Sequence, residues 1–397
     1  MIDLRAARNG PDDFRRRLAR KGAAEAFDQL LAADERWREI VPRVDELRAR
    51  TKLKGKPTPE QLEELRGVKD ELQRAEQELA EAETLRDELA LRVPNPPADD
   101  VPDGSTEDDV REERRVGEPP KLTDPKEHLE IGRFDMERAA RMSGARFGYW
   151  IGDTGRLALA LYRYALDRLA AKGFVTVLPP VLVREEALIG TGAFPSDEAN
   201  VYEIEADELY LAGTAEIPLA SLHAGEIVEG LPLRYVAFSP CFRREAGAAG
   251  RDTRGMIRVH QFNKVEQFSI TQPESSWEEH ELLLGNTEEL VRDLGLPYRV
   301  VVLPAGDMSS ASAKTYDVEI WFPSQDRYRE TASISNTTDF QSRRLGIRHR
   351  TGKNLEPVHM LNGTAVVDRM ALALLENFQG DVPDVLREYG APEHVRK

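Results

Sequence analysis

The chain has 397 residues, of which 40% are hydrophobic and 32% are charged, and its 55 Lys and Arg stand against 71 Asp and Glu. The resulting net charge of −16 argues against indiscriminate nucleic-acid binding, because affinity for phosphate backbones comes from Lys and Arg. We find no run of 18 apolar residues that predicts a membrane span, and the single Cys241 excludes an internal disulfide framework and disfavours a cysteine-rich zinc site.

The N-terminal stretch "MIDLRAARNGPDDFRRRL" lacks the apolar core of a secretory signal, so we expect a cytoplasmic protein.

Two heptad patterns follow, and their turn-rich connection "KLKGKPTPE" predicts an antiparallel helical hairpin, a coiled-coil arm. Pro42 is expected to kink or fray the first helix. The first seam is Leu30, Ala33, Trp37, Ile40, Val44, Leu47 and Thr51; the second is Leu65, Val68, Leu72, Ala75, Leu79, Ala82 and Leu89, with Arg86 in one slot.

A helical hairpin of this kind serves either as a dimerisation coiled coil or as an arm that contacts phosphates. Residues 43–56, next to the connecting turn, hold six Lys and Arg against two acidic residues, which favours the arm. We place this N-terminal domain at residues 1–100. Residues 101–124, in a stretch with many prolines and the acidic run "DDVPDGSTEDDVREE", are expected to form a linker to a second domain at 125–397.

In the second domain, "GRLALALYRYALDRLAAK" (155–172) predicts a helix, and "FVTVLPPVLV" predicts a strand ended by Pro179 and Pro180. "LRYVAFSPCFRRE" and "IRVHQFNKVEQFSIT" alternate like paired strands around a Gly-rich loop. "KTYDVEIWFP" and "RYRETASIS" are two more strands, and "VHMLNGTAV" leads into the helix "MALALLENFQ". This order favours an α+β domain with a mostly antiparallel sheet flanked by helices.

The segment "RREAGAAGRDTRGMIRVHQF" (243–262) concentrates arginines in an acidic chain. Arg243 and Glu245 share one face of a strand end, and Phe262 and Glu266 lie on the returning strand. A guanidinium suits a phosphate, a phenyl ring stacks on a base, and a carboxylate accepts from an exocyclic amine, so these residues can hold a nucleotide. Composition alone also allows a surface hairpin with solvated charges.

The stretch "CFRREAGAAGRDTRGMIRVHQFNKVEQF" resembles the second signature motif of class II aminoacyl-tRNA synthetases, in the form used by seryl-tRNA synthetases. "GFVTVLPPVLV" resembles motif 1, "TAEIPLAS" the serine loop, and "LNGTAVVDRMALALLEN" motif 3. "GDMSSASAKTYDVEIWFPSQDRYRETASISNTTDFQSRR" is similar to the segment that holds metal and substrate. The hairpin matches the family's tRNA-binding arm, so the resemblance covers essentially the whole chain.

The resemblance implies a serine–tRNA ligase that uses ATP and Mg²⁺, forms seryl-adenylate from L-serine, and transfers serine to the 3′ end of tRNA(Ser). It also implies a homodimer built through motif 1. The implied catalytic residues are Arg243, Arg369 and Glu330. The implied ATP ligands are Arg243, Glu245, Phe262, Glu330, Ser333 and Arg369, with Glu330 and Ser333 holding the metal. The implied serine ligands are Thr214, Glu216, Arg243, Glu266, Asn362 and Thr364. Arg251 and Arg254 contact either the acceptor end of tRNA or only solvent.

Three departures from the family pattern keep other interpretations open. The step from Asn362 to Arg369 is one residue short, with Asp368 before the arginine; Asn263 stands where Asp is usual; and the arm is about ten residues short. One alternative is a paralogue that activates serine or a related small amino acid for another acceptor. The other is a non-catalytic protein that binds tRNA or a partner.

Overall fold

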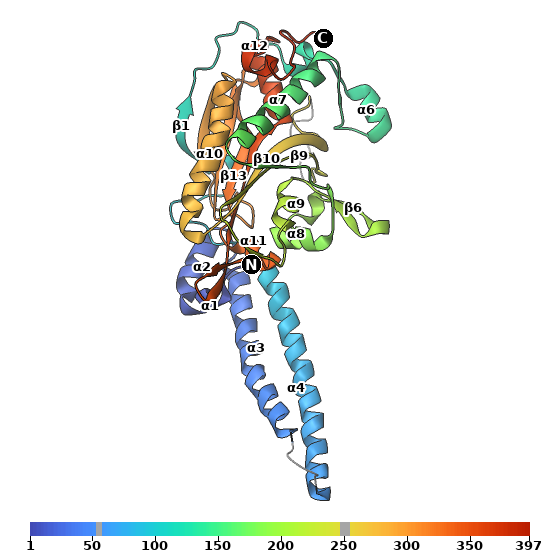
Figure 1. Ribbon diagram of the computed structural model, residues 1–397, viewed down its shortest axis with the longest axis vertical. Coiled ribbons are helices and arrows are strands. Elements are labelled where there is room, and N and C mark those ends of the chain that lie inside the picture. Colours follow the sequence, from blue (N-terminus) through green and yellow to red (C-terminus); the bar gives the residue numbers. More distant parts are fainter. Residues whose placement is uncertain (53–57, 247–254) are drawn as a thin grey trace. The chain divides into compact units, whose positions relative to one another are not determined.

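The computed structural model describes residues 1–52, 58–246 and 255–397 (Figure 1). The chain divides into two compact units, Met1–Pro96 and Pro97–Lys397. Each unit is described by itself.

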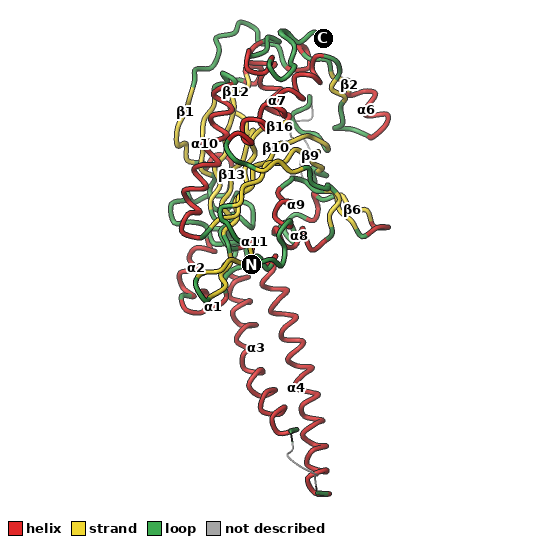
Figure 2. The backbone as a smooth tube through the Cα atoms, in the orientation of Figure 1, coloured by secondary structure: helices red, strands yellow, loops and turns green. Residues whose placement is uncertain are grey.

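Unit 1 contains a helical hairpin in which two long helices run side by side (Figure 2). Its seam is formed by Ile40, Val44 and Leu47 packed against Val68 and Ala75, which confirms the predicted pairing of the two apolar patterns. The helices of the unit are α1 (Leu4–Asn9), α2 (Pro11–Ala19), α3 (Ala24–Arg50) and α4 (Pro59–Arg92).

Two details of the hairpin differ from a uniform apolar seam. The helix α3 includes Pro42, at which a kink or fraying was expected, and runs unbroken to Arg50. The slot filled by Arg86 faces the other helix, where its guanidinium lies 4.2 Å from the centroid of the Trp37 ring. A cation over an indole face is favourable, so the charged residue is accommodated in the seam.

The basic residues near the turn are partly engaged by α4. Arg43 lies 3.4 Å from Glu71, and Arg48 donates to Glu76 at 3.0 Å. These cross-helix pairs are exposed, so each adds little to stability, but they set the register of the two helices. The remaining basic residues of the turn, Lys54 and Lys56, lie outside the described residues.

Unit 2 is built on a sheet that has eight strands in the described part of the chain. Neighbouring strands are antiparallel, except that β4 runs parallel to β9. The predicted fold class, α+β with a mostly antiparallel sheet, is therefore confirmed. In spatial order the strands are β1 (Arg111–Val116), β11 (Tyr298–Val302), β12 (Lys314–Phe322), β13 (Arg327–Asn336), β16 (His359–Val367), β10 (Gln261–Thr271), β9 (Leu233–Phe242) and β4 (Val175–Val177).

Three long helices cover one face of this sheet, and a cavity opens on the other face. The amphipathic helices α7 (Asp153–Ala171), α10 (Ser276–Asp293) and α12 (Asp368–Phe378) pack on the sheet in one apolar core (Figure 1). On β10 the side chain of Gln267 faces α10, where it donates to the carbonyl oxygen of Leu283 at 2.9 Å. Because side chains alternate along a strand, Lys264 and Glu266 share the opposite face. The thiol of Cys241 is buried in the adjacent strand β9.

The segment expected to be a linker, 101–124, contributes to the sheet. Its residues 111–116 form the edge strand β1, which pairs with β11 from Arg111 opposite Val302 to Val116 opposite Tyr298, with a register shift between Glu112 and Arg114. Most side chains of β1 are exposed, so the strand has no apolar alternation by which the sequence could reveal it. Backbone pairing and the ion pair of Arg114 with Glu288 at 2.5 Å hold it.

Shorter elements complete unit 2. None of the described helices is both long and apolar enough to cross a bilayer. The short strands are β2 (Phe134–Asp135), β3 (Tyr149–Trp150), β5 (Leu182–Val183), β6 (Tyr202–Ile204), β7 (Leu209–Leu211), β8 (Ile227–Val228), β14 (Arg348–Thr351) and β15 (Asn354–Pro357); the short helices are α5 (His128–Ile131), α6 (Met136–Ser143), α8 (Glu185–Thr191), α9 (Glu216–Ser221), α11 (Phe340–Leu345) and α13 (Asp384–Arg387).

Candidate active site

A cavity of about 390 Å³ opens on the face of the sheet opposite α10 in unit 2. Its walls come from β10, β12, β13 and β16, from the first turns of α9 and α12, and from residues 256–259. All eleven residues that the resemblance singled out line this one cavity, although they span 156 positions of sequence. They are Thr214, Glu216, Arg243, Glu245, Phe262, Glu266, Glu330, Ser333, Asn362, Thr364 and Arg369.

Arg243 and Phe262 meet where β9 and β10 end. The guanidinium carbon of Arg243 lies 5.3 Å from the centroid of the Phe262 ring, and its Nε donates to the carbonyl oxygen of Gly213 at 3.3 Å. These contacts hold a cation and an aromatic face side by side. That combination suits the phosphate and the base of one nucleotide.

Glu245 follows β9 and has a left-handed backbone, with φ of 53°. This conformation is costly for a residue with a Cβ and is often found at functional sites. An ion pair with Arg258 at 2.5 Å holds its carboxylate. The expected alternation of Arg243 and Glu245 on one strand face is therefore replaced by a turn that presents both side chains to the cavity.

Arg369 lies in the first turn of α12 and reaches across to β13. Its guanidinium is 3.7 Å from the carboxylate of Glu330 and also donates to the carbonyl oxygen of that residue. A second nitrogen lies 3.5 Å from the carbonyl oxygen of Ile257. The arginine is thereby fixed between β13 and the segment that follows the Gly-rich loop.

Two carboxylates, of Asp317 on β12 and Glu330 on β13, lie near each other where these strands form a wall of the cavity. The Ser333 hydroxyl donates to the carboxylate of buried Asp317. Burial, and then the charge of Glu330, raise the pKa of Asp317 well above its usual range. Asp317 was not predicted from the sequence, because a lone acidic residue in a strand pattern gives no sign of burial.

At the other end of the cavity, Lys264 lies between two predicted residues. Its Nζ is 2.7 Å from the Thr214 hydroxyl and 2.5 Å from Oε2 of Glu266. Burial raises the pKa of Glu266, and Lys264 acts in the opposite direction. Lys264 was also missed, although its position two residues before Glu266 on the same strand could have revealed it.

Glu216 accepts two amide hydrogen bonds at the start of α9. Its Oε1 lies 2.7 Å from Nε2 of Gln341 and 2.9 Å from Nδ2 of Asn362. Burial, followed by the nearby charge of Glu266, raises the pKa of Glu216 to about 7. Gln341 was not anticipated, since nothing in the local sequence connects it with a segment 125 residues away.

Asp368 and Asn263, two of the departures from the family pattern, belong to one buried network. The carboxylate of Asp368 accepts from the hydroxyl of Tyr162 and, at 3.0 Å, from the backbone N–H of Asn263. Burial raises the pKa of Asp368 to about 6. The acidic side chain is therefore engaged by donors from α7 and β10. Arg251 and Arg254 lie outside the described residues.

Comparison with known proteins gives matches along the whole chain. Residues 1–97 match the seryl-tRNA synthetase N-terminal domain, and residues 201–378 match the tRNA synthetase class II core domain (G, H, P, S and T). A serine–tRNA ligase of Cenarchaeum symbiosum is 43% identical and covers 100% of both chains. A serine–tRNA ligase of Thermobifida fusca is 45% identical over 98% of this chain and 97% of its own.

A solved structure agrees with these matches. The seryl-tRNA synthetase of Pyrococcus horikoshii, in a crystal structure with ATP, superposes with a TM-score of 0.93 at 39% identity, covering 100% of this chain and 99% of its own. Both units of the present chain therefore have counterparts in that protein.

Proposed function

The chain belongs to the seryl-tRNA synthetase family, and on that premise we propose how the cavity of unit 2 carries out the family's reaction. The protein is a serine–tRNA ligase that activates serine with ATP and transfers it to tRNA. The proposal rests on the presence of two different binding regions in one cavity. At one end, Arg243 and Phe262 suit the phosphate and the base of a nucleotide. At the other end, the charged pair of Lys264 and Glu266 suits the carboxylate and the ammonium of an amino acid.

The chemistry requires charge neutralisation more than a protein nucleophile. A carboxylate oxygen of serine attacks the α-phosphorus of ATP, the bond to the β-phosphate oxygen breaks, and pyrophosphate leaves. The terminal hydroxyl of tRNA then attacks the seryl carbonyl carbon, and AMP leaves. Because both reactants of the first step are anions, Arg243 at the α-phosphate is the main stabilising group of the protein.

Each ATP-binding role follows from one contact. Phe262 stacks on adenine, and Glu245, held by Arg258, accepts from the adenine amino group. Arg369 contacts the γ-phosphate from the first turn of α12, where Glu330 and the Ile257 carbonyl hold it. The positive end of that helix also favours an anion.

The serine end matches a small zwitterion with a hydroxyl group. Oε2 of buried Glu266 pairs with the ammonium of Lys264 at 2.5 Å, and the substrate ammonium can compete with Lys264 for this carboxylate. Thr214, Glu216, Asn362 and Thr364 surround the side-chain position. If alanine binds in place of serine, the buried polar groups of the pocket lose their hydroxyl partner. This loss discriminates against alanine more strongly than the loss of one apolar contact would.

The residues present fit a magnesium ion. Glu330 and Ser333 supply the hard oxygen donors that Mg²⁺ prefers, and the buried carboxylate of Asp317 adjoins them through the Ser333 hydroxyl. Glu330 and Ser333 would hold the ion together with phosphate oxygens. When bound, Mg²⁺ supplies neutralisation of the phosphate charge.

We assign the N-terminal domain, near residues 1–100, to tRNA binding through its hairpin, and unit 2, which includes the expected linker with its strand β1, to catalysis. The match of residues 1–97 to the seryl-tRNA synthetase N-terminal domain supports this division. The basic residues adjoining the turn are suited to phosphates of tRNA(Ser).

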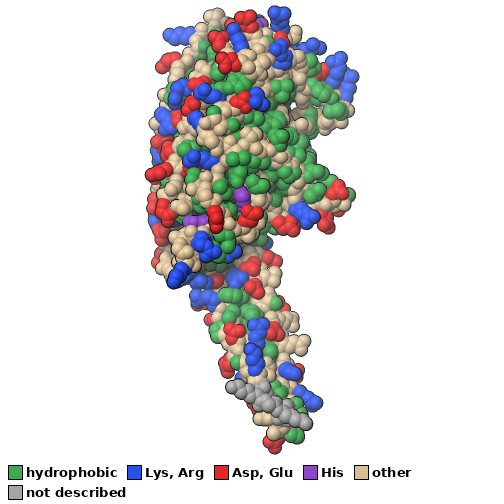
Figure 3. Space-filling view, viewed as in Figure 1, with side chains coloured by type: hydrophobic (Ala, Val, Ile, Leu, Met, Phe, Trp, Pro, Cys, Tyr) green, Lys and Arg blue, Asp and Glu red, His purple; other side chains and the backbone are tan. Residues whose placement is uncertain are grey.

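We also propose a homodimer built on the motif 1 region. Hydrophobic side chains gather on the face of unit 2 seen in Figure 3. Leu159 on α7, Val175 on the edge strand β4 and Leu178 just beyond it are 66%, 58% and 78% exposed. Such exposed apolar residues beside an unpaired strand edge are typical of an interface. Sedimentation of the wild type and Leu178→Glu tests this: a monomeric wild type would contradict it.

A cytoplasmic location completes the proposal. The only cysteine is a buried free thiol, as expected in a reducing compartment.

The direct test is ATP–pyrophosphate exchange with each of the twenty amino acids, followed by charging of serine tRNA. We expect exchange with serine alone and charging of that tRNA. Exchange with a different amino acid, or exchange without charging, would contradict the proposed reaction.

A further inference from the structure

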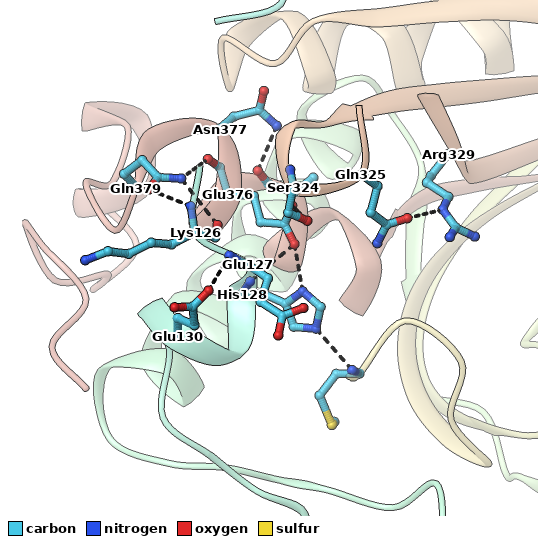
Figure 4. Close-up of polar contacts among 12 residues, drawn as sticks. Lys126, Glu127, His128, Glu130, Ser324, Gln325, Arg329, Glu376, Asn377 and Gln379 are labelled. Atoms are coloured by element: carbon cyan, nitrogen blue, oxygen red, sulfur yellow. Dashed lines mark hydrogen bonds and ion pairs between the residues drawn. The ribbon is translucent and has the colours of Figure 1, made fainter. Parts of the chain in front are cut away.

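His128, the first residue of α5, lies buried against the C-terminal half of α12 (Figure 4). The exposed fractions of His128 and Glu376 are 2% and 0%. Oε1 of Glu376 lies 2.8 Å from Nδ1 of His128 and accepts from the backbone N–H of the same histidine at 3.2 Å. On the other side of the ring, the backbone N–H of Met256 donates to Nε2 at 3.1 Å.

These partners assign the tautomer of the imidazole. A backbone nitrogen can only donate, so Nε2 carries the lone pair and Nδ1 carries the proton that Glu376 accepts. The second oxygen of Glu376 accepts from the hydroxyl of Ser324 at 2.6 Å and from its backbone N–H at 3.3 Å. The carboxylate is thus saturated with donors, and the ring has one orientation.

The backbone next to Met256 is shaped to approach this ring. Gly255 has φ of +78°, and a Cβ at that position would lie 2.6 Å from Nε2 of His128. A side chain there would be strained and would also displace the imidazole. The ring of Phe134 packs edge-on against the histidine, 6.0 Å between centroids. The close contact of imidazole and backbone therefore depends on this glycine.

Met256 begins a segment whose next two residues contact the ATP-binding groups. The carbonyl oxygen of Ile257 accepts from Arg369, and Arg258 pairs with Glu245. Arg369 and Glu376 are seven residues apart on α12, which places them about two turns apart on one face of the helix. The helix thus holds Ile257 directly at one end and Met256 through His128 at the other.

We propose that His128 is a positioning residue of the ATP site: by accepting from the backbone N–H of Met256, it fixes residues 256–258, and through them Glu245 and Arg369. The inference rests on the proposed function of the cavity. The serine end is built on β10, β16 and the start of α9, whereas the hydrogen bonds of His128 lead to Glu376 and Met256, so we expect the effect to be confined to ATP.

Two amide substitutions separate the two nitrogens of the ring. In His128→Asn the amide reaches the position of Nδ1 and keeps a donor for Glu376, but it leaves Met256 without an acceptor. In His128→Gln the amide oxygen reaches the position of Nε2 and can accept from Met256. Ser324→Ala is the matched control, because it removes one hydrogen bond from Glu376 without touching the histidine.

The readouts are the KM values for ATP and serine in pyrophosphate exchange and the hydrogen–deuterium exchange of a peptide that begins at least two residues before Met256, so that it retains the backbone amide of Met256. For His128→Asn we expect about a tenfold rise in the KM for ATP, an unchanged KM for serine and faster amide exchange, since one positioning hydrogen bond is worth about that factor. His128→Gln should restore both values, and Ser324→Ala should lower only the melting temperature.

The proposal is overturned if His128→Asn keeps the wild-type KM for ATP, or if all three variants change it equally, because the cluster would then be merely structural. Absence of serine-dependent exchange in the wild type would instead contradict the proposed function. In that case amide exchange still tests whether His128 holds the backbone of Met256. Equal exchange rates in His128→Asn and the wild type would exclude that contact.

Discussion

The ammonium group of Lys264 lies 2.5 Å from Oε2 of Glu266, two residues further along the same face of β10. Both side chains are buried, so each charge depends on the other in the absence of substrate. Serine brings one positive and one negative group of its own. We expect its ammonium to compete for Glu266 and its carboxylate to lie toward Lys264 and Arg243.

Glu266→Gln should raise the KM for serine by about 10- to 100-fold, because a hydrogen bond to a charged group is worth about 1.5–3 kcal/mol. The KM for ATP should change little. Pyrophosphate exchange at varied serine measures both. Ser269→Ala, which removes another buried polar side chain of the same strand, is the control for stability. An unchanged KM for serine would refute the role of Glu266.

Arg243→Ala should abolish adenylate formation and leave the fold intact, and Arg243→Lys should recover little, since an ammonium lacks the planar fork of a guanidinium. The neighbouring Arg244 is outside the cavity lining and faces Tyr202, 5.9 Å from the ring centroid. Arg244→Ala is therefore the matched control and should retain exchange. Single-turnover adenylate formation is the measurement; activity of Arg243→Ala near the wild-type level would exclude our assignment.

Glu216 gives the stability of the unliganded protein a pH dependence. Its pKa is about 7 in the folded protein against an ordinary 4.5, so the native state binds more protons between these values and stability falls as the pH rises from about 4.5 to 7. Glu216→Gln keeps the acceptor oxygen for Gln341 and Asn362 without the charge. Between about pH 4.5 and 7, the free energy of unfolding of this variant should therefore fall by about 2–3 kcal/mol less than that of the wild type.

The measurement is urea denaturation of wild type and variant at pH 5 and pH 8. Glu266 and Asp368 also have raised pKa values and contribute to the wild-type slope in the same direction. The difference between the two proteins therefore isolates Glu216. Parallel pH profiles would show that Glu216 does not titrate in this range.

The hairpin of unit 1 should be needed for charging but not for activation. Replacing residues 41–81 by a short Gly-Ser turn joins Ile40 to Ala82, which the cross-helix contacts of Arg36 with Glu78 and Trp37 with Arg86 place near one another. Serine-dependent pyrophosphate exchange should persist, and the KM for serine tRNA should rise by at least about tenfold as phosphate contacts are lost. Full charging by the shortened protein would remove the proposed role of the arm.

The sequence predicted those elements in which one face is apolar. The periodicity of α7, the alternation in β9 and β10, and the two seams of the hairpin all express burial against a core. Strand β1 was missed because most of its side chains face solvent, so its sequence lacks the apolar alternation of a half-buried strand. Pro42, expected to kink or fray α3, lies inside a helix that is unbroken from Ala24 to Arg50.

For the site, the motifs predicted which residues come together but not their partners. All eleven predicted residues line the cavity. Lys264, Asp317 and Gln341 were missed, because a charged or amide side chain within a strand or helix pattern reads as a surface residue until tertiary structure buries it. The contacts of Asp368 with Tyr162 and Asn263 likewise join segments more than 100 residues apart.

The buried thiol of Cys241 has a practical consequence for spectroscopy. Burial raises the pKa of this thiol, so it is protonated at neutral pH and shielded from maleimides and similar reagents. Since it is the only cysteine of the chain, a cysteine introduced at an exposed position would be the one site that accepts a fluorophore or spin label. The unaltered protein is thus a ready background for reporters attached to either helix of the hairpin.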